Sequence, residues 1–339
     1  MWTLVARIAG VVCLAWIALV SAAQAQTQQL KLATFGPPSS YFYVEVILPW
    51  AEAVAKDSSG TIEIKHFGGG LIAGAGNMYD SVLNGAADIG WSITPSSFRQ
   101  TGVIELPFAY DTGEEGAVAL WRIYEKGLLA DDYKAVKVFG MTAWPGTTIA
   151  SRKPISKLED FKGLKVAVST KRRAETIGVL GAVPVSIPTD QAYEAVDRGV
   201  VDAAWSSHTA TRQFKLYEVA KHWLDVSLAG GTGFLIMKKE RFDALPPQAQ
   251  AALLKHSGES LSRALGKSND GEITRALSFM KDQEKTGKVT PVAQLSAAEL
   301  SRWKAATASI GEEWAKSLPN GAAIRDEYAN QVANVRAGK

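Results

Sequence analysis

A fourteen-residue pattern occurs twice in this chain of 339 residues. The first copy, MYDSVLNGAADIGW, covers Met78–Trp91, and the second, AYEAVDRGVVDAAW, covers Ala192–Trp205. Each copy has the pattern of a helix end, a glycine that stops the helix, and a short apolar strand that ends in tryptophan. Because one unit occurs twice, the sequence predicts two similar α/β lobes. The alternative is a chance likeness between two short segments whose tryptophans belong to the cores.

The tryptophans of the two copies are expected at the carboxyl ends of strands, which is where open α/β sheets bind their ligands. Trp144 ends a third predicted strand at the same edge. We therefore predict a cleft between two strand edges, lined by Trp91, Trp144 and Trp205. Aromatic faces suit a ligand with a ring or an apolar chain.

Residues 1–25 have the pattern of a secretory signal peptide. An apolar run of thirteen residues, Ile8–Val20, is followed by Ala23-Gln24-Ala25, which predicts cleavage after Ala25. The only cysteine, Cys13, lies in this segment, so the mature chain is expected to have no disulfide. No later stretch is long and apolar enough to cross a membrane. We expect a soluble protein of the periplasm.

Composition and motifs argue against several classes of function. Charged residues make up 21% of the chain, are scattered, and give a net charge of +3, so no basic stripe for nucleic acid is present. There is no nucleophile elbow and no P-loop. We expect no enzymatic activity, no cofactor and no metal, with a dispersed periplasmic active site as the alternative. Metal-binding spacing is missing from all four histidines: His66, His208, His222 and His256.

One motif favours a dinucleotide fold when it is taken alone. Gly68, Gly70 and Ala73 follow a predicted strand in G-x-G-x-x-A spacing, and Asp88 lies twenty residues after Gly68. However, Asp88 precedes its strand, whereas a ribose-binding acid should follow one, and the next helix starts late, near Asn77. We expect instead a flexible loop whose backbone amides, that of Gly70 among them, lie near a ligand.

Several further segments are specific in combination: LKLATFGPPSS, SSGTIEIKHFGGGL, LNGAADIG, IELPFAYDTGEE, KPISKLEDFKGLKVAV, GAVPVSIPTDQAYEAVDRGVVDAA, LYEVAKHWLDVS and FDALPPQAQAAL. Over the whole mature chain they resemble the DctP-like solute-binding proteins of tripartite ATP-independent periplasmic (TRAP) transporters. The resemblance implies an α/β, two-lobed periplasmic binding protein fold, with a ligand cleft between the lobes and one long helix that spans them. It also implies a receptor that passes a small organic acid to membrane permease subunits. A receptor that feeds a sensor kinase is the alternative, and we expect a monomer.

The chain pattern predicts where each lobe lies. We expect lobe I to comprise residues 26–150 and about 237–265, and lobe II to comprise residues 151–236 and about 266–339. The long helix is expected from Pro247 to about Lys285, because the helical pattern is almost unbroken there.

The chain departs from the family pattern at the ligand. The family's G-L-K-x-R arginine, which pairs with the ligand carboxylate, is replaced by Ala167, and Ser206 stands where an asparagine is usual. Another common basic position is Thr147 or Thr148. These departures leave two possibilities: the ligand lacks the usual carboxylate, or another cation binds it.

Lys171, Arg172 and Arg173 open the helix after this strand and could supply that cation, and Arg173 is our choice. The alternative is a solvated basic turn. A cation here, together with the tryptophans at the predicted strand edges, favours an aromatic or apolar organic acid as the ligand over a small dicarboxylate. The predicted ligand-binding residues are Phe35, Gly70, Trp91, Ser92, Trp144, Thr147, Ser169, Arg173, Trp205 and Ser206.

Overall fold

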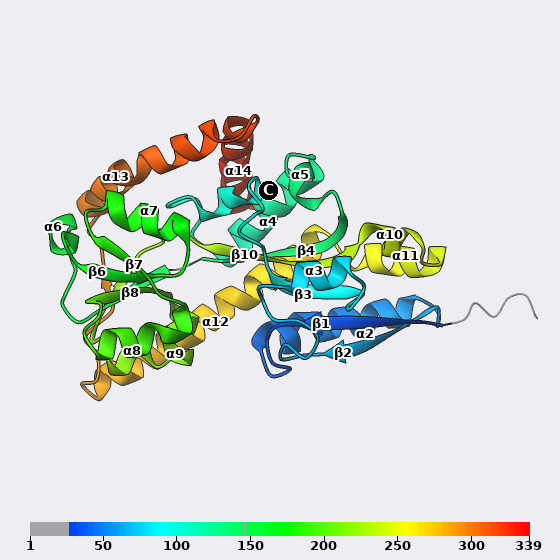
Figure 1. The fold of residues 1–339 in the computed structure, drawn as a ribbon, viewed down its shortest axis with the longest axis horizontal. Helices are drawn as coiled ribbons and strands as arrows, with labels where there is room; N and C mark the ends of the chain where they lie inside the picture. Colours follow the sequence, from blue (N-terminus) through cyan, green and yellow to red (C-terminus); the bar gives the residue numbers. More distant parts are fainter. Residues whose placement is uncertain (1–26, 146) are drawn as a thin grey trace, which may run out of the picture.

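The computed structural model describes residues 27–145 and 147–339, and of Thr147 only the backbone. The predicted signal peptide, residues 1–25, lies outside these residues. The described chain forms two lobes, each a sheet with helices on both faces (Figure 1). Each sheet separates two hydrophobic cores, so each lobe has three layers. No helix of the described part is long and apolar enough to cross a membrane.

Lobe I contains a sheet with the order β2-β1-β3-β10-β4. The strands β1, β2 and β3 are parallel, and β10 is antiparallel to β3 and β4. Their bounds are β1 Gln28–Thr34, β2 Ile62–Phe67, β3 Ile89–Ile93, β4 Val136–Trp144 and β10 Gly231–Lys238. Its helices are the π-helix η1 (Tyr43–Ile47), α2 (Leu48–Asp57), α3 (Met78–Leu83), η2 (Thr101–Glu105), α4 (Gly113–Glu125), α5 (Ala130–Tyr133), α10 (Lys239–Asp243) and α11 (Pro247–Lys255).

Lobe II contains a sheet with the order β11-β9-β5-β8-β6-β7. The strands β6, β7 and β8 are parallel, and β5 is antiparallel to β8 and β9. Their bounds are β5 Thr147–Ser151, β6 Lys165–Val168, β7 Val183–Ser186, β8 Ala203–Ser207, β9 His222–Asp225 and β11 Ala293–Gln294. Its helices are α6 (Leu158–Phe161), α7 (Lys171–Val179), η3 (Thr189–Gln191), α8 (Ala192–Asp197), α9 (His208–Gln213) and η4 (Leu216–Glu218).

The two sequence copies fold into the same unit, α3 with β3 and α8 with β8. The helix of each copy stops at a glycine with positive φ, Gly85 at 76° and Gly199 at 70°. A side chain at such a φ is strained, so glycine is required at both stops. The strand of each copy continues two residues beyond its tryptophan, to Ile93 and Ser207.

An aspartate holds each strand of the repeat to its parallel neighbour. Asp88 accepts a hydrogen bond from the backbone N–H of Lys31 at 2.8 Å, and Asp202 accepts one from the backbone N–H of Lys165 at 2.9 Å. Asp88 also forms an ion pair with Arg241 at 2.8 Å. Matching glycines and matching aspartates therefore explain why the two segments share a sequence pattern.

Two backbone segments connect the sheets, one from β4 to β5 and one from β9 to β10. Tyr110 lies between them, with its hydroxyl 3.3 Å from the carbonyl oxygen of Trp144 and 3.3 Å from that of Gly231. A Cβ on Gly230 would lie 1.7 Å from this hydroxyl, so only glycine fits there. Tyr110 therefore connects the two segments about which the lobes would move.

The predicted long helix is divided into two. The structure has α11 at Pro247–Lys255 and a separate helix α12 at Glu259–Lys285. Gly258 interrupts the pattern with a φ of 93°, and its N–H donates to the carbonyl of Phe139 at 2.7 Å. The helix α12 still runs from lobe I to lobe II (yellow in Figure 1), and its buried residues include Leu265 at one end and Met280 at the other.

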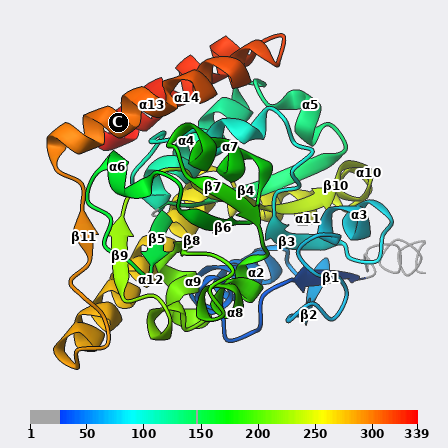
Figure 2. The same cartoon turned by 60° about the vertical axis from the view of Figure 1, so that its left-hand side comes forward.

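The last two helices return the chain to lobe I. Helix α13 (Ala297–Lys316) places Trp303 in a lobe II core and Trp314 in a lobe I core, and α14 (Gly321–Arg336) packs Tyr328 against lobe I. Figure 2 shows α13 and α14 side by side.

The sheet order places the lobe crossings elsewhere than the sequence predicted. The expected lobe I range ended at residue 150, but β5 already belongs to the lobe II sheet. The expected lobe II ranges included residues 231–236 and α14, but β10 lies wholly in the lobe I sheet and α14 covers α4. The boundaries differ because short segments, from β4 to β5 and from β9 to β10, connect a strand of one sheet to a strand of the other.

Candidate ligand-binding site

A cleft of about 860 Å³ lies between the lobes beside α12. Lobe I contributes the turn after β1, the start of the π-helix, and the ends of β3 and β4. Lobe II contributes α9 and the residue that caps it. We call this space the aromatic cleft, and its lining residues are Phe35, Gly36, Pro37, Ser39, Ser40, Tyr41, Phe42, Val44, Glu45, Trp91, Ile93, Trp144, Ser207, Thr209, Arg212, Gln213, Glu272 and Arg275.

The lobe I wall of the aromatic cleft consists of stacked rings. Phe35 lies parallel to Trp91, with centroids 5.0 Å apart and planes 12° apart. Phe42 lies 5.0 Å from Trp91 and 5.8 Å from Trp144, which it meets edge-on. Trp91 is only 2% exposed, whereas Phe35 and Trp144 are partly exposed. A flat apolar group entering the cleft would therefore meet Phe35 and Trp144 first, with Trp91 fixing their positions.

The opposite wall is polar and comes from lobe II and α12. Ser207 caps α9 by accepting the N–H of Ala210 at 3.1 Å, and its hydroxyl lies 3.0 Å from that of Thr209. Arg212 of α9 forms an ion pair with Glu272 of α12. The cleft therefore has an apolar side on lobe I and a hydrogen-bonding side on lobe II.

The face of the lobe II sheet that turns toward α9 carries no charged side chain at the positions where the family's cation is expected. Ala167 pairs with Ala204, and Thr148 pairs with Ser206, so the register puts these side chains on one face. Ala167 is 2% exposed and Ser206 is 1% exposed. The hydroxyl of Ser206 lies 3.5 Å from that of Thr211, which packs over it. This position is filled by small buried side chains.

The other face of the same sheet carries Trp205 and, above it, Arg173 of α7. The guanidinium carbon of Arg173 lies 5.3 Å from the centroid of the Trp205 ring, and its Nη1 donates to Ser169 at 3.3 Å. No carboxylate in residues 27–145 or 147–339 forms an ion pair with Arg173. Trp205 is 3% exposed, so Arg173 covers it.

Glu105 and Tyr110 of lobe I lie close enough to Arg173 to act on its charge. Burial lowers the pKa of the Arg173 guanidinium, while Glu105 and Tyr110 act in the opposite direction. Burial raises the pKa of Glu105, and Arg173 and Arg172 counteract this shift. Both groups are thus poorly solvated charges, which need a partner more than exposed charges do.

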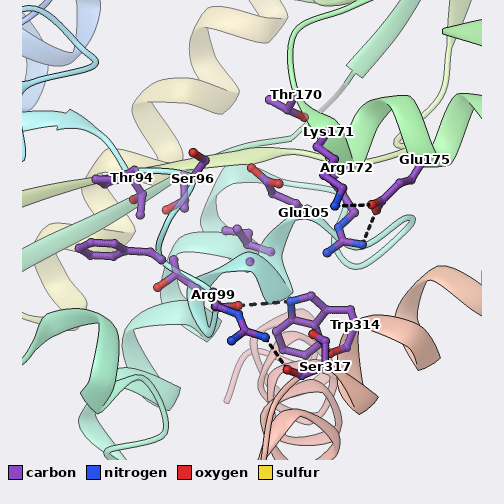
Figure 3. Close-up of a pocket in the computed structure, with 16 residues that line it drawn as sticks. Thr94, Ser96, Arg99, Glu105, Thr170, Lys171, Arg172, Glu175, Trp314 and Ser317 are labelled. Carbon is purple, nitrogen blue, oxygen red and sulfur yellow. Dashed lines mark hydrogen bonds and ion pairs between the residues drawn. The ribbon is translucent and has the colours of Figure 1, made fainter.

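A second space, of about 230 Å³, opens between α7 and the lobe I loop before η2 (Figure 3). We call it the α7 pocket. In it Arg172 is bound to Glu175 at 2.6 Å, and the backbone carbonyl of Arg99 accepts from the indole of Trp314 at 3.3 Å. Glu105 lines this pocket as well. Its lining residues are Thr94, Pro95, Ser96, Phe98, Arg99, Thr101, Gly102, Ile104, Glu105, Thr170, Lys171, Arg172, Glu175, Thr232, Trp314 and Ser317.

The structure therefore separates the predicted site residues. Phe35, Trp91 and Trp144 lie together in the aromatic cleft. Ser169, Arg173 and Trp205 lie together on the α7 side of lobe II. Ser206 is buried under α9, and the side chain of Thr147 lies outside the described atoms.

Two predicted residues use their polar groups within the fold. The N–H of Gly70 donates to the carbonyl of Thr34 at 3.1 Å, so it is not free for a ligand. The hydroxyl of Ser92 donates to the carbonyl of Ala75 at 3.1 Å, because alternation along β3 turns it away from the side of Trp91. Both interactions hold the glycine-rich loop in place.

The dinucleotide alternative finds no support in the geometry. Asp88, the candidate ribose ligand, sits before β3 and is bound to Lys31 and Arg241. Two histidines are paired with aspartates, His208 with Asp225 at 2.8 Å and His256 with Asp57 at 2.6 Å. The described residues contain no group of three or more potential metal ligands.

Sequence reasoning missed several residues of the aromatic cleft. Arg212 and Gln213 follow the second repeat closely, and the hydroxyl-rich segment after Trp205 was a usable signal for them. Glu272 and Arg275 belong to α12, far away in the sequence, and only the fold brings them to the cleft. Tyr41 donates to Asn269 of α12 at 2.9 Å, and this contact was equally invisible in the sequence.

Comparisons with known proteins agree with the fold and with the family resemblance. The family described as bacterial extracellular solute-binding protein, family 7 (DctP) matches residues 32–317. A solute-binding protein of Albidiferax ferrireducens is 26% identical over 307 residues, covering 84% of this chain and 86% of that protein. The TsaT protein of Comamonas testosteroni, named as an outer membrane transporter protein, is 27% identical over 263 residues, covering 75% and 78%.

Solved structures are similar along nearly the whole chain. A TRAP periplasmic solute-binding protein from Desulfovibrio salexigens has a TM-score of 0.79 and 26% identity, and covers 90% of this chain and 96% of that one. A marine metagenome TRAP solute-binding protein, described as specific for aromatic acid ligands, has a TM-score of 0.80 and 25% identity, with 91% and 98% covered. The two-lobed fold and the matching family model lead to one conclusion: this chain belongs to the family 7 bacterial extracellular solute-binding proteins.

Proposed function

We propose that this receptor binds a small organic acid with an aromatic or apolar body. The chain is a TRAP-type solute receptor, which captures a small organic ligand and delivers it to membrane permease subunits. The observation that carries the proposal is the wall of Phe35, Trp91 and Trp144 in a cleft of about 860 Å³. A cleft of this size has room for a small organic ligand.

The proposed partner of the ligand carboxylate is Arg173. It replaces in function the family arginine whose position is held by Ala167. Three observations support it: the side chain is partly buried, it lies near enough to Glu105 and Tyr110 of lobe I for their charges to affect it, and no described carboxylate forms an ion pair with it. A guanidinium binds a carboxylate through two parallel hydrogen bonds, which also orients the ligand.

A related structure supports an aromatic ligand. The marine metagenome protein, 25% identical to this chain, is described as specific for aromatic acids and holds 3-hydroxybenzoate. By contrast, a relative from Rhodobacter capsulatus, 27% identical over 66% of this chain, is named a C4-dicarboxylate-binding protein. The aromatic wall favours the first kind of ligand for this chain.

Binding experiments test this proposal directly. In isothermal titration calorimetry, 3-hydroxybenzoate or benzoate should bind, and succinate and malate should not. Small-angle scattering with saturating 3-hydroxybenzoate should give a smaller radius of gyration, because ligand closes the lobes about the two crossing segments. Tight binding of succinate together with no binding of either aromatic acid would contradict the proposed ligand class.

The remaining expectations about the cellular role belong to the same proposal. The signal peptide would be removed after Ala25 on export to the periplasm, so the mass of the mature protein should correspond to a chain that begins at Gln26. The receptor would be a monomer that does not convert its ligand. Recovery of unchanged ligand after prolonged incubation checks the second expectation, and turnover would favour the enzyme alternative.

A further inference from the structure

The charged side chains of the aromatic cleft neutralise one another. Arg275 binds Glu272 at 2.7 Å and Glu45 at 3.0 Å, and Arg212 binds the other oxygen of Glu272. Ser268 adds a hydrogen bond to Glu45 at 2.7 Å. Two arginines thus face two carboxylates, and this side of the cleft has no charge left over.

One carboxylate of this group, that of Glu272, is held more firmly than the arginines. The side chain of Glu272 is 7% exposed and has both oxygens bound, whereas those of Arg212 and Arg275 are 41% and 46% exposed. A buried carboxylate that lost an arginine would be left partly unpaired, which is costly. Glu272 therefore keeps both arginines occupied when a second anion approaches.

On the α7 side of lobe II, the positive side chains are not all paired with carboxylates. Arg172 is bound to Glu175, and Lys171 has a side chain that is 92% exposed, so water screens its charge. Only Arg173 combines partial burial with the lack of a described carboxylate partner. Glu105 acts on the charge of Arg173 without forming an ion pair with it, so among these described residues Arg173 is the poorly solvated cation that has no ion-pair partner.

We propose that the binding region accepts a single anionic group, so that the ligands are aromatic monocarboxylic acids whose second polar group is uncharged. The carboxylate binds Arg173, and the uncharged groups on the lobe II side of the aromatic cleft, those of Ser207, Thr209 and Gln213, suit a hydroxyl on the ring. A second carboxylate there would lose its hydration without gaining a cation, because Arg212 and Arg275 are already paired with Glu45 and Glu272. This inference rests on the proposed function, because it specifies the ligand class of the same site.

The test compares two ligands that differ at one ring position. 3-Hydroxybenzoate carries a meta hydroxyl, and isophthalate carries a carboxylate in its place. Calorimetry on the wild type should show 3-hydroxybenzoate binding at least about tenfold more tightly than isophthalate. The variant Glu272→Gln frees Arg212 for a second carboxylate, so isophthalate should gain about tenfold in affinity relative to 3-hydroxybenzoate.

Two further variants complete the design. Asp282→Asn makes a comparable charge change on α12, at an exposed pair with Lys285 outside the cleft, and should leave the ligand ratio unchanged. If Glu272→Gln does not fold, Glu45→Gln replaces it, because this partly exposed residue neutralises Arg275. Binding of 3-hydroxybenzoate reports on correct folding in every variant.

The outcomes separate this inference from the proposed function. Equal binding of the two acids by the wild type would overturn the inference, as would an unchanged ratio in both Glu272→Gln and Glu45→Gln. In each of those cases aromatic acids still bind and the proposed function stands. Failure of the wild type to bind either acid would overturn the proposed function and this inference with it.

Discussion

Lobe I and lobe II contain the same helix–turn–strand unit, yet the tryptophan of each copy has different neighbours. Trp91 supports a wall of rings, with Phe35 stacked 5.0 Å away. Trp205 lies under the guanidinium of Arg173, 5.3 Å from its ring centroid. The backbone of the repeat is therefore shared, while the side chains around it give one lobe an apolar surface and the other a cationic one. Under the proposed function, the chemistry of the ligand depends on these surrounding side chains.

The largest effect expected is on stability and is shared by the two copies. Trp91→Ala and Trp205→Ala should each lower the free energy of unfolding by roughly 3–5 kcal/mol, because both rings are nearly buried. Trp144→Ala should lower it less, since this ring is partly exposed. Chemical denaturation followed by circular dichroism measures all three. A loss below about 1 kcal/mol at either repeat tryptophan would show that the copies are not equivalent in the core.

The aspartates of the repeat offer a finer comparison. Asp88→Asn should lower the free energy of unfolding by about 1–3 kcal/mol, because it weakens both a backbone hydrogen bond and the ion pair with Arg241. Asp202→Asn should lower the free energy of unfolding by about 1 kcal/mol. Asp202 accepts a hydrogen bond from the backbone of Lys165 but, unlike Asp88, has no arginine partner among the described residues. Equal losses of unfolding free energy in the two variants would mean that the ion pair with Arg241 does not stabilise lobe I.

The apolar wall can be tested separately from the cation. Phe35→Ala should weaken binding of 3-hydroxybenzoate by about 1–2 kcal/mol, because it removes a ring that faces the cleft. Tyr217→Ala serves as the control, since Tyr217 packs on Phe279 in lobe II away from the cleft. Calorimetry should show normal affinity for the control. Normal affinity in Phe35→Ala as well would contradict the proposal that the apolar wall of lobe I binds the ligand.

The smallest expected effect concerns Glu105, opposite Arg173. Burial raises the pKa of this carboxyl, so its contribution to stability is fully present below its unfolded-state pKa and is lost as pH rises through the raised value. Glu105→Gln should therefore gain stability relative to the wild type as the pH goes from about 4 to about 7. Thermal unfolding at the two pH values measures this. A stability difference that does not change with pH would show that Glu105 is not desolvated.

Local sequence signals were sufficient to predict several helices and strands and to predict two similar lobes. The repeat, its glycine stops and the predicted strand that ends at Trp144 agree with the structure because each depends on neighbouring residues. The break at Gly258 was missed, since one glycine in a long helical pattern does not reveal its φ. The lobe crossings were misplaced, because strand pairing across the fold decides them.

The site could be predicted only in part, for a physical reason. Alternation along a strand decides which face a side chain occupies, and this separated Trp205 and Ser206, which are adjacent in sequence. The amide of Gly70 was assigned to a ligand, but the carbonyl of Thr34 takes it. The charges of Glu272 and Arg275 came to the cleft on α12, through packing that no local pattern encodes.

The central claim is that the acid group of the ligand binds Arg173 while its ring rests on lobe I. Calorimetric titration of 3-hydroxybenzoate and of the uncharged 3-hydroxybenzyl alcohol tests it in the wild type, in Arg173→Ala and in the control Lys171→Ala. The wild type and Lys171→Ala should prefer the acid by at least about tenfold. Arg173→Ala should bind the two compounds with affinities within about twofold of each other. An undiminished preference for the acid in Arg173→Ala would contradict the account.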